Sequence, residues 1–346
     1  MERRVDITHK EVNSSPTSVD VARRAGVSQS AVSLVFGGKA AGRVGKQTQE
    51  AILRAAQELG YLPNNAARTL RSGRSRLIAL AVPDVGNPYF AAVLQGAERA
   101  ARKYGYTAML ASVRDGQDWQ PVVLDALASR AVDGFLLCTL QPPTIKEQTA
   151  LRGKAVMVDA FCEALPSLRL DIEAGMYAAM SHLLRLGHTK IAHLAAAVDA
   201  ETFQRRHQVY LDALQAAGIP VTAAYQVRAP FTIDETHQAA RLALELSDPP
   251  SAFVCDSDVL AVGVYKAAKD LQRAIPGDLS VVSFDDSIIA RILDPELTTV
   301  AIPGNAIGEQ ALQLLLAVLE EEDIPWQTTV PLDLVIRAST SVINAR

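Results

Sequence analysis

The feature that most constrains the fold is an alternation of short apolar segments with longer amphipathic ones, which begins near residue 77. The apolar segments are LIALAV (77–82), TAMLAS (107–112), GFLLCTL (134–140), AVMVDA (155–160), KIAHLAA (190–196), SAFVCD (251–256) and LSVVSFD (279–285). Segments with helical periodicity lie between them, such as AAVLQGAERAARKYG (91–105), HQVYLDALQAAG (207–218) and AIGEQALQLLLAVLEEE (306–322). This order predicts parallel sheets covered on both faces. The roughly 270 residues involved exceed what one sheet usually carries, so we expect two α/β lobes.

The segment 17–36 predicts two short helices joined by a tight turn. Thr17, followed three residues later by Asp20, is a candidate capping box for the first helix. Gly26 can adopt the left-handed conformation that ends this helix, and Ser28 can cap the next one. The pattern is typical of a helix-turn-helix, whose second helix can enter the major groove of DNA.

Two polar residues at the start of the second helix are candidates for base contacts. Gln29 can pair bidentately with adenine, while Ser30 is permissive. Residues 1–76 contain 13 lysines and arginines against 6 acidic residues, a formal charge of +7, whereas the remainder carries −11. This asymmetry fits nucleic-acid contact, although a solubilising tail would show it too.

The cysteines and the apolar segments bear on the compartment. Cys138, Cys162 and Cys255 are odd in number and lack metal-ligand spacing, so we expect reduced thiols and a cytoplasmic protein associated with the nucleoid. No apolar stretch approaches the roughly 18 residues that span a bilayer, and the first residues lack a signal-peptide core, so no membrane association is expected. We expect no cofactor, no metal and no catalytic residues.

Two segments carry a resemblance to a known family. DVARRAGVSQSAVSLVF (20–36) and RVGKQTQEAILRAAQELGYLPNNAARTLRSGRS (43–75) closely resemble the lactose/galactose repressor family of bacterial regulators. The resemblance implies an all-α helix-turn-helix headpiece with a hinge helix, then a two-lobed α/β body with parallel sheets, similar to periplasmic binding proteins. The implied domains are a tail (1–16), a headpiece (17–62), a hinge (63–75) and a body (76–346). Within the body, the first lobe comprises about 76–172 and 303–331, and the second about 173–302 and 332–346.

The resemblance also implies how DNA is bound. In the family, the hinge folds on operator DNA and a leucine from each subunit, here Leu70, enters a minor-groove step. The full set of expected DNA-binding residues is Thr17, Ser28, Gln29, Ser30, Ser33, Lys39, Arg43, Thr48, Asn64, Arg68, Leu70 and Arg71. Three departures leave the operator sequence open: Leu34 stands where many relatives have arginine, Ala31 replaces a common threonine, and the loop GGKAAGRVGKQT (37–48) is longer than in the lactose repressor.

Polar and aromatic residues follow the predicted strands of the body, where open α/β sheets place their ligand sites. The resemblance implies a small-molecule effector bound between the lobes. The expected effector-binding residues are Tyr89, Phe90, Asp159, Arg206, Phe231, Ser257 and Asp285. We place Tyr89 and Phe90, and the pair Arg205–Arg206, in loops that precede helices. Asp258 is expected to cap the helix after it, and Asp286 to face solvent.

The sequence thus predicts a sequence-specific transcriptional regulator, a repressor, that binds near-palindromic double-stranded operator DNA as a homodimer under the control of a sugar or sugar derivative. A purine-responsive regulator of the same architecture is the main alternative. An enzyme is disfavoured because GxGxxG, GxSxG and HExxH are absent, and GRVGKQT (42–48) fails the phosphate-loop pattern at Ala40 and Gln47. A sugar-transport binding protein is disfavoured by the basic N-terminal segment.

Overall fold

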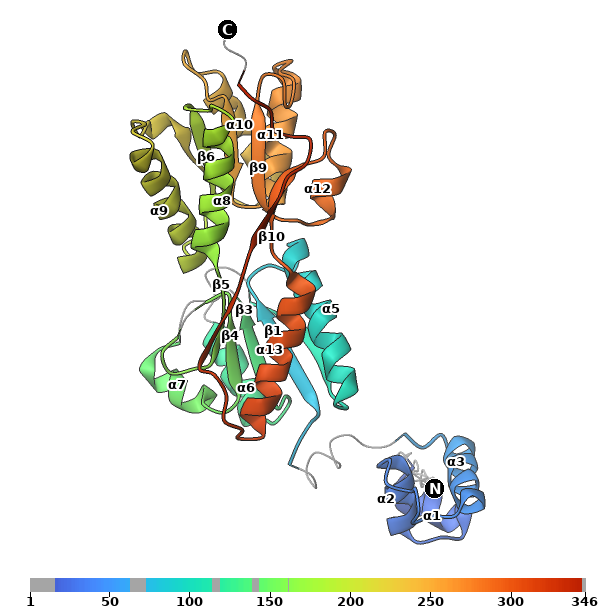
Figure 1. Cartoon of the computed structure of the whole chain (residues 1–346). Coiled ribbons are helices and arrows are strands. Elements are labelled where there is room, and N and C mark those ends of the chain that lie inside the picture. The colour runs from blue at the N-terminus through green and yellow to red at the C-terminus, as the bar shows by residue number, and fades with distance from the viewer. Residues whose placement is uncertain (1–15, 63–72, 114–118, 139–142, 161, 344–346) are drawn as a thin grey trace, which may run out of the picture. The chain divides into compact units, whose positions relative to one another are not determined.

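The computed structural model describes residues 16–62, 73–113, 119–138, 143–160 and 162–343. The chain divides into two compact units, Met1–Ser75 and Arg76–Arg346 (Figure 1). Most of the predicted hinge and nearly all of the predicted tail lie outside the described residues.

The first unit is a three-helix headpiece. Its helices are α1 (Ser18–Ala25), α2 (Gln29–Phe36) and α3 (Lys46–Leu59). They pack around a small apolar core of Val21, Ala22, Val32, Ile52, Ala55 and Ala56. The capping box at Thr17, the left-handed Gly26 (φ 67°) and the Ser28 cap all form as predicted. The helix-turn-helix is therefore confirmed.

The second unit contains two six-stranded sheets, and we call each sheet with its covering helices a lobe. The sheet of lobe 1 has the order β11-β5-β4-β3-β1-β2 and is entirely parallel. Its strands are β1 (Leu77–Val82), β2 (Thr107–Ser112), β3 (Gly134–Cys138), β4 (Ala155–Val158), β5 (Ser167–Leu170) and β11 (Gln327–Val330). Its helices are α5 (Pro88–Lys103), α6 (Trp119–Ala128), α7 (Ile145–Leu151) and α13 (Gly304–Leu319).

The sheet of lobe 2 has the order β12-β10-β9-β8-β6-β7, and only β12 is antiparallel to its neighbour. Its strands are β6 (Ile191–Ala196), β7 (Gln226–Ala229), β8 (Ala252–Cys255), β9 (Ser280–Asp285), β10 (Thr298–Ala301) and β12 (Asp333–Val335). Its helices are α8 (Ile172–Arg185), α9 (Glu201–Ala216), the 3-10 turn η1 (Ala223–Tyr225), α10 (Ile233–Leu244), α11 (Asp258–Asp270) and α12 (Ile288–Ile292). The predicted two-lobed α/β body is confirmed.

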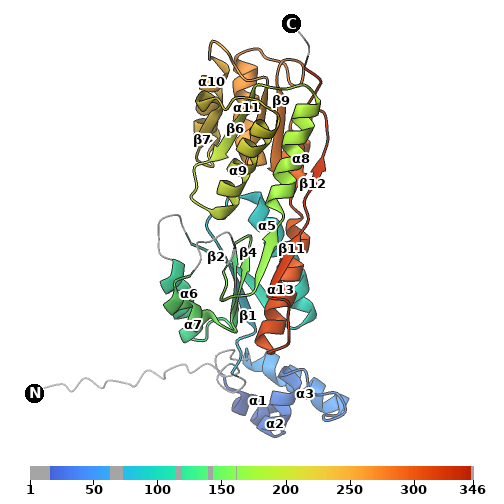
Figure 2. The ribbon, with the colours of Figure 1, turned by 60° about the vertical axis from the view of Figure 1, so that its left-hand side comes forward.

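The chain passes between the lobes at three places. These are the steps from β5 to α8, from β10 to α13, and from β11 to β12 (Figure 2). Each step is short. The first runs from Leu170 to Ile172, the second from Ala301 to Gly304, and the third from Val330 to Asp333. The apolar core continues through both sheets.

Helices α5 and α13 lie side by side in lobe 1 and approach unusually closely (Figure 1). A Cβ atom added to Gly96 would lie 1.9 Å from the carbonyl oxygen of Asn305, and one added to Gly308 would lie 1.9 Å from that of Val93. Only hydrogen fits at these positions, so the two backbones are in direct contact.

Two helices begin earlier than the sequence periodicity predicts. Helix α5 starts at Pro88, with Asn87 as its cap, so Tyr89 and Phe90 are helical rather than in a loop. Helix α9 starts at Glu201, so Arg206 also lies within a helix. In both cases the first turn projects polar or aromatic side chains, which obscures the apolar periodicity. Placing these residues in loops was therefore wrong.

Candidate functional site

The recognition helix α2 presents the predicted base-contacting side chains at its start. Gln29 and Ser30 are both exposed. The Gln29 amide donates a hydrogen bond of 2.9 Å to the Ser18 hydroxyl, which holds the side chain across the turn between the helices. A bidentate contact with adenine uses this same amide group, so it would replace the bond to Ser18.

The other predicted DNA-binding residues of the headpiece differ in their exposure and in their hydrogen bonds. Lys39 and Arg43 are exposed on the loop after α2, while Ser33 and Thr48 are half-buried. The Thr17 hydroxyl donates to Asp20 at 2.7 Å, so its proton is already engaged in the cap. Four further predicted residues, Asn64, Arg68, Leu70 and Arg71, lie outside the described residues.

In the body, carboxylates gather where strands end. Asp159 follows β4 in lobe 1, and Asp285 ends β9 in lobe 2. Both residues have a positive backbone φ, 52° for Asp159 and 115° for Asp285. Residues other than glycine adopt such angles only at an energetic cost. Such strain is concentrated at functional sites.

Arg206 is buried, with 3% of its surface exposed, and its guanidinium is held over two aromatic rings. The guanidinium carbon lies 4.1 Å from the centre of the Phe284 ring and 5.3 Å from that of Phe203. Nη1 donates to the main-chain carbonyl of Asp256, whereas Nε has no hydrogen-bond partner in the described part of the chain. A buried cationic donor without a partner is costly, so this atom is suited to a ligand acceptor.

Tyr89 supplies a matching group from lobe 1. Its hydroxyl is buried and has no hydrogen-bond partner among the residues that the structure describes. Burial raises the pKa of Tyr89 well above its usual value, and the nearby charges of Asp159 and Asp285 act in the same direction, against Arg206. The side chains of Tyr89, Asp159, Arg206 and Asp285 are therefore close enough to interact, and they come from both lobes.

Ser257, Phe231 and Phe90 support this group in other ways. The Ser257 hydroxyl caps α11 by accepting from Val259 N–H, and it donates to Asp285 at 2.6 Å. Phe231 packs against Phe203, with ring centres 5.9 Å apart. Phe90 is buried beside Tyr89. Their expected contacts with an effector stay predictions.

Two expectations about neighbouring carboxylates were wrong. Asp258 does not cap α11, because Ser257 does; instead, its carboxylate accepts bonds from the hydroxyls of Ser283, Ser287 and Thr299. Asp286 does not face solvent freely but pairs with the guanidinium of Arg337.

The sequence interpretation missed two residues of this region. The hydroxyl of Thr202, in the first turn of α9, is buried and has no partner within residues 16–62, 73–113, 119–138, 143–160 and 162–343. Thr202 also lines a narrow pocket, with room for about one water molecule, between Asp159 and Ile172. Phe203, the next residue, stacks on Arg206. Their positions on α9, three and four residues before Arg206, would have pointed to them had the helix start been predicted correctly.

Asp285 is the most perturbed carboxyl of the group. Burial and the neighbouring Asp258 carboxyl raise its pKa to about 8, although the Ser257 hydrogen bond and Arg206 act in the opposite direction. In the unfolded chain this carboxyl ionises near its ordinary pKa, so the folded state keeps the proton up to a higher pH than the unfolded state does. Stability is therefore expected to fall as the pH rises from about 4 to about 8.

Replacing Asp285 by asparagine should remove this pH-dependent loss. We expect the melting temperature of the variant to exceed that of the wild type by roughly 5 °C at pH 8, with a smaller difference at pH 5. Thermal melts across this range provide the measurement. A difference that does not change with pH would contradict the assignment.

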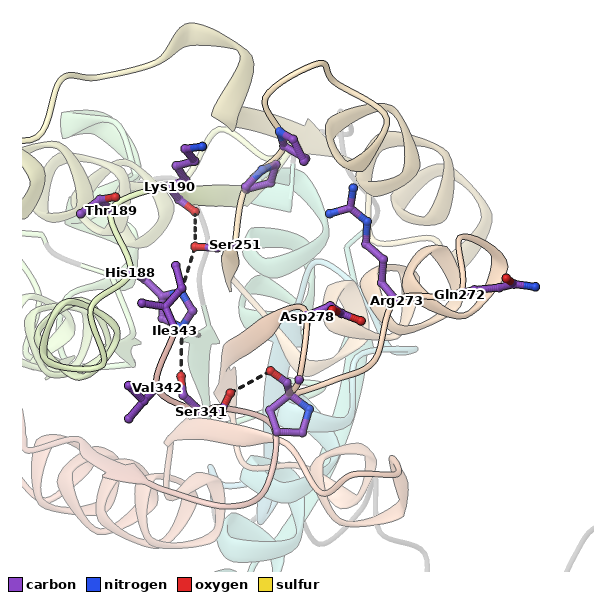
Figure 3. Close-up of a pocket in the computed structure, with 14 residues that line it drawn as sticks. His188, Thr189, Lys190, Ser251, Gln272, Arg273, Asp278, Ser341, Val342 and Ile343 are labelled. Atoms are coloured by element: carbon purple, nitrogen blue, oxygen red, sulfur yellow. Dashed lines mark hydrogen bonds between the residues drawn. The ribbon is translucent and has the colours of Figure 1, made fainter. Parts of the chain in front are cut away.

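A separate pocket of about 600 Å³ lies at the end of the lobe 2 sheet where its parallel strands begin (Figure 3). His188 is buried beside it, and its two ring nitrogens bond to the hydroxyl of Ser251 and the carbonyl of Ser341 (Figure 3). The hydroxyl of Ser280 is a further partner. Every ring nitrogen is thus engaged, which identifies His188 as a structural link between β8, β9 and the C-terminal segment.

None of the described helices is long and apolar enough to cross a membrane. In the same part of the chain, no three His, Cys, Asp or Glu side chains are grouped as metal ligands would be.

Comparisons with known proteins agree with this architecture. Residues 18–64 match the model of bacterial regulatory proteins of the lacI family, and residues 180–340 match a periplasmic binding protein-like domain. The chain is 31% identical over 340 residues to the HTH-type transcriptional repressor CytR of Escherichia coli (strain K12). The aligned region covers 96% of this chain and 99% of that protein. It is 33% identical over 323 residues to the ribose operon repressor of Halalkalibacterium halodurans, covering 93% and 96%.

Solved structures show the same fold. The complex of the transcriptional regulator CelR with cellobiose matches with a TM-score of 0.69 and 28% identity, over 94% of this chain and 99% of that one. The Lac repressor dimer bound to operator matches with a TM-score of 0.84 and 24% identity, over 95% and 100%. With the helix-turn-helix and the two-lobed body, these likenesses establish that the chain belongs to the lacI family of bacterial regulatory proteins and is a DNA-binding transcriptional regulator.

Proposed function

We propose that this regulator is a repressor that binds a near-palindromic operator as a homodimer and responds to a sugar or sugar derivative. The effector would bind to Tyr89, Asp159, Arg206 and Asp285. The main support is a pair of buried polar atoms from different lobes, Tyr89 Oη and Arg206 Nε, for which the described residues provide no hydrogen-bond partner.

The chemistry of this group suits a polyhydroxylated ligand. Carboxylates accept hydrogen bonds from hydroxyls, and a guanidinium donates them in a fixed geometry. Aromatic side chains, here Tyr89 and Phe90, would offer a flat apolar surface to the face of a sugar ring. The ribose operon repressor and the CelR–cellobiose complex among the relatives add support for a sugar.

A ligand that contacts both lobes can control DNA binding through the angle between them. Binding stabilises the arrangement in which both sets of contacts form, and it shifts the population only by its difference in affinity for the two arrangements. Further support comes from the three short passages between the lobes, because each can change its backbone angles without unfolding either sheet.

Dimerisation has support from exposed apolar side chains in both lobes. Met109 and Leu110 are 41% and 36% exposed on the edge strand β2, and Ile288 and Ile292 are 65% and 70% exposed on α12. Apolar side chains grouped on a surface often mark an interface. A twofold dimer would present two headpieces to the two halves of a near-palindrome.

The proposed boundaries are a headpiece at 17–62, a hinge at 63–75 and a body from 76. The separation of the chain into two units after Ser75 supports the start of the body.

A thermal-shift screen of the full chain tests the effector class. Sugars, sugar phosphates, nucleosides and purines would be compared at millimolar concentration. A ligand that binds only the native state must raise the melting temperature, by an amount that grows with its concentration. We expect the largest shift from a sugar or sugar phosphate; a shift from free purines alone would favour the purine-responsive alternative.

Replacing Leu70 by alanine tests the hinge prediction, which rests on the family resemblance. Operator affinity is expected to fall about 100-fold, because an apolar wedge stabilises the bent operator, while affinity for random DNA stays nearly unchanged. Filter retention of both DNAs provides the measurement. Equal losses on both would show that Leu70 is not the wedge.

A further inference from the structure

Lobe 2 contains a second pocket, of about 420 Å³, that includes no residue of lobe 1. It lies between α9 and the strands β6 and β7 at the edge of the sheet, a region visible in Figure 2. Its polar lining consists of His193, Asp199, Gln204, His207, Gln226 and Arg228. The volume falls within the range of small-molecule sites.

The lining of this pocket combines an apolar part with cationic and donor groups. Phe203, Val198 and the alanines of β6 form the apolar part. Arg228 is exposed and makes no ion pair with the described carboxylates. Asp199, the only acid in the lining, is bonded by the Gln204 amide at 2.7 Å. The open groups therefore favour an anion attached to an apolar body.

Two stacked histidines connect this pocket to the interior. The rings of His207 and His193 lie 5.4 Å apart, centre to centre, and their Nδ1 atoms are separated by 3.1 Å. One ring must donate and the other accept, so a single proton lies between them. His207 is partly accessible, whereas His193 is completely buried.

The connection continues to Arg206 of the proposed effector group. His193 Nε2 lies 3.0 Å from Oδ1 of Asp256, and the main-chain carbonyl of Asp256 accepts from Arg206. Burial acts to raise the pKa of Asp256, but His193, Arg206 and the Ala196 amide outweigh it and hold the pKa below its usual value. The Asp256 carboxylate thus holds His193, while the main-chain carbonyl of the same residue holds Arg206.

The charge of His207 depends on what occupies the pocket. Burial lowers its pKa, and His193 and Arg228 lower it further, while Asp256 and the Gln226 side chain act against them. Tyr210 packs against the same ring from within α9. An anion placed between Arg228 and His207 would oppose the lowering, so binding should be accompanied by proton uptake.

We infer that this pocket binds a small organic oxyanion, a carboxylate or phosphate ester, and that its occupancy is transmitted through His207, His193 and Asp256 to Arg206. The oxyanion contacts Arg228 and His207, and the apolar body of the ligand packs on Phe203. The binding part of this inference is independent of the proposed function; only its effect on effector response rests on the role of Arg206.

Isothermal titration of the full chain with benzoate and with phenyl phosphate tests the pocket, and benzamide serves as the uncharged control. We expect both anions to bind at millimolar concentration, more tightly at pH 6 than at pH 8, and with proton uptake seen as a dependence of the heat on the buffer. Benzamide should not bind. Binding of only one anion would identify its head group as the one recognised.

Matched variants locate the site. Arg228→Met should weaken anion binding about tenfold or more, and His207→Gln should abolish the pH dependence. Lys266→Met, which removes an exposed cation of α11 in the same lobe, should leave binding unchanged. If neither anion binds, or if Arg228→Met binds the anions as tightly as the wild type does, the inference is overturned. Loss of binding in Arg206→Ala with retention in Arg228→Met would also overturn it, because the anion would then bind at the effector group instead.

Discussion

Replacing Gly308 by alanine is expected to lower the melting temperature of the body by roughly 5–10 °C. The added Cβ would lie 1.9 Å from the Val93 carbonyl oxygen and 2.8 Å from the Ala97 nitrogen. Both are main-chain atoms of α5, and a helical backbone cannot turn aside as a side chain can. The helices must separate and lose packing between buried residues, at a cost of about 3 kcal/mol or more.

Calorimetry or thermal melts of the full chain measure this effect, and Gly277→Ala is the matched control. A Cβ at Gly277 would meet only the Cβ of Ala274, at the ordinary distance of 3.5 Å, so the control should melt within about 2 °C of the wild type. Gly96→Ala should reproduce the Gly308→Ala effect, because it faces the Asn305 carbonyl in the same interface. Wild-type stability in both would disprove the direct backbone contact.

Replacing Arg206 by alanine is expected to weaken effector binding about 100-fold or more while the protein still binds DNA. The guanidinium is buried between two aromatic rings, and its Nε has no partner within the described residues. Removing it takes away the only cation of the proposed effector group, together with the buried Nε donor. The effector found in the thermal-shift screen should then produce no shift.

Two further variants separate binding from folding. Arg206→Lys retains the charge but loses the forked geometry, so we expect an intermediate affinity with a nearly normal melting temperature. Arg241→Ala removes an exposed arginine of α10 that pairs with Glu245, and it should respond to the effector as the wild type does. If Arg206→Ala still responds normally, the effector binds elsewhere.

Much of the fold could be predicted because the apolar pattern reflects burial directly. Strands β1, β3, β4, β6, β8 and β9 are buried along almost their whole length, and each appears as an apolar segment. β5, β7, β10, β11 and β12 were not predicted. They are only three or four residues long and include Ser, Thr, Arg, Gln or Asp, so they carry no comparable signal.

The candidate site was harder to predict because its properties depend on the partners of each side chain. Ser257 and Asp258 are adjacent acceptors before a helix, and the sequence does not distinguish which one caps it; the hydroxyls of Ser283, Ser287 and Thr299 decide the matter by binding Asp258. Thr202 carries no signal in the sequence unless the start of α9 is known. In the structure it is distinguished by a buried hydroxyl that lacks a partner among the described residues.

The close contact of α5 with α13 has a mechanical consequence. Helix α5 carries Tyr89 in its first turn, and α13 begins directly after the passage at Ile302–Pro303. Because their backbones touch at Gly96 and Gly308, the two helices cannot slide past each other without a clash. A displacement of Tyr89 would therefore move α5 and α13 together and change the backbone angles near residue 302. Rotation between the lobes would have to occur there, near Asp171 and near Pro331, while α5 and α13 turn as one rigid unit.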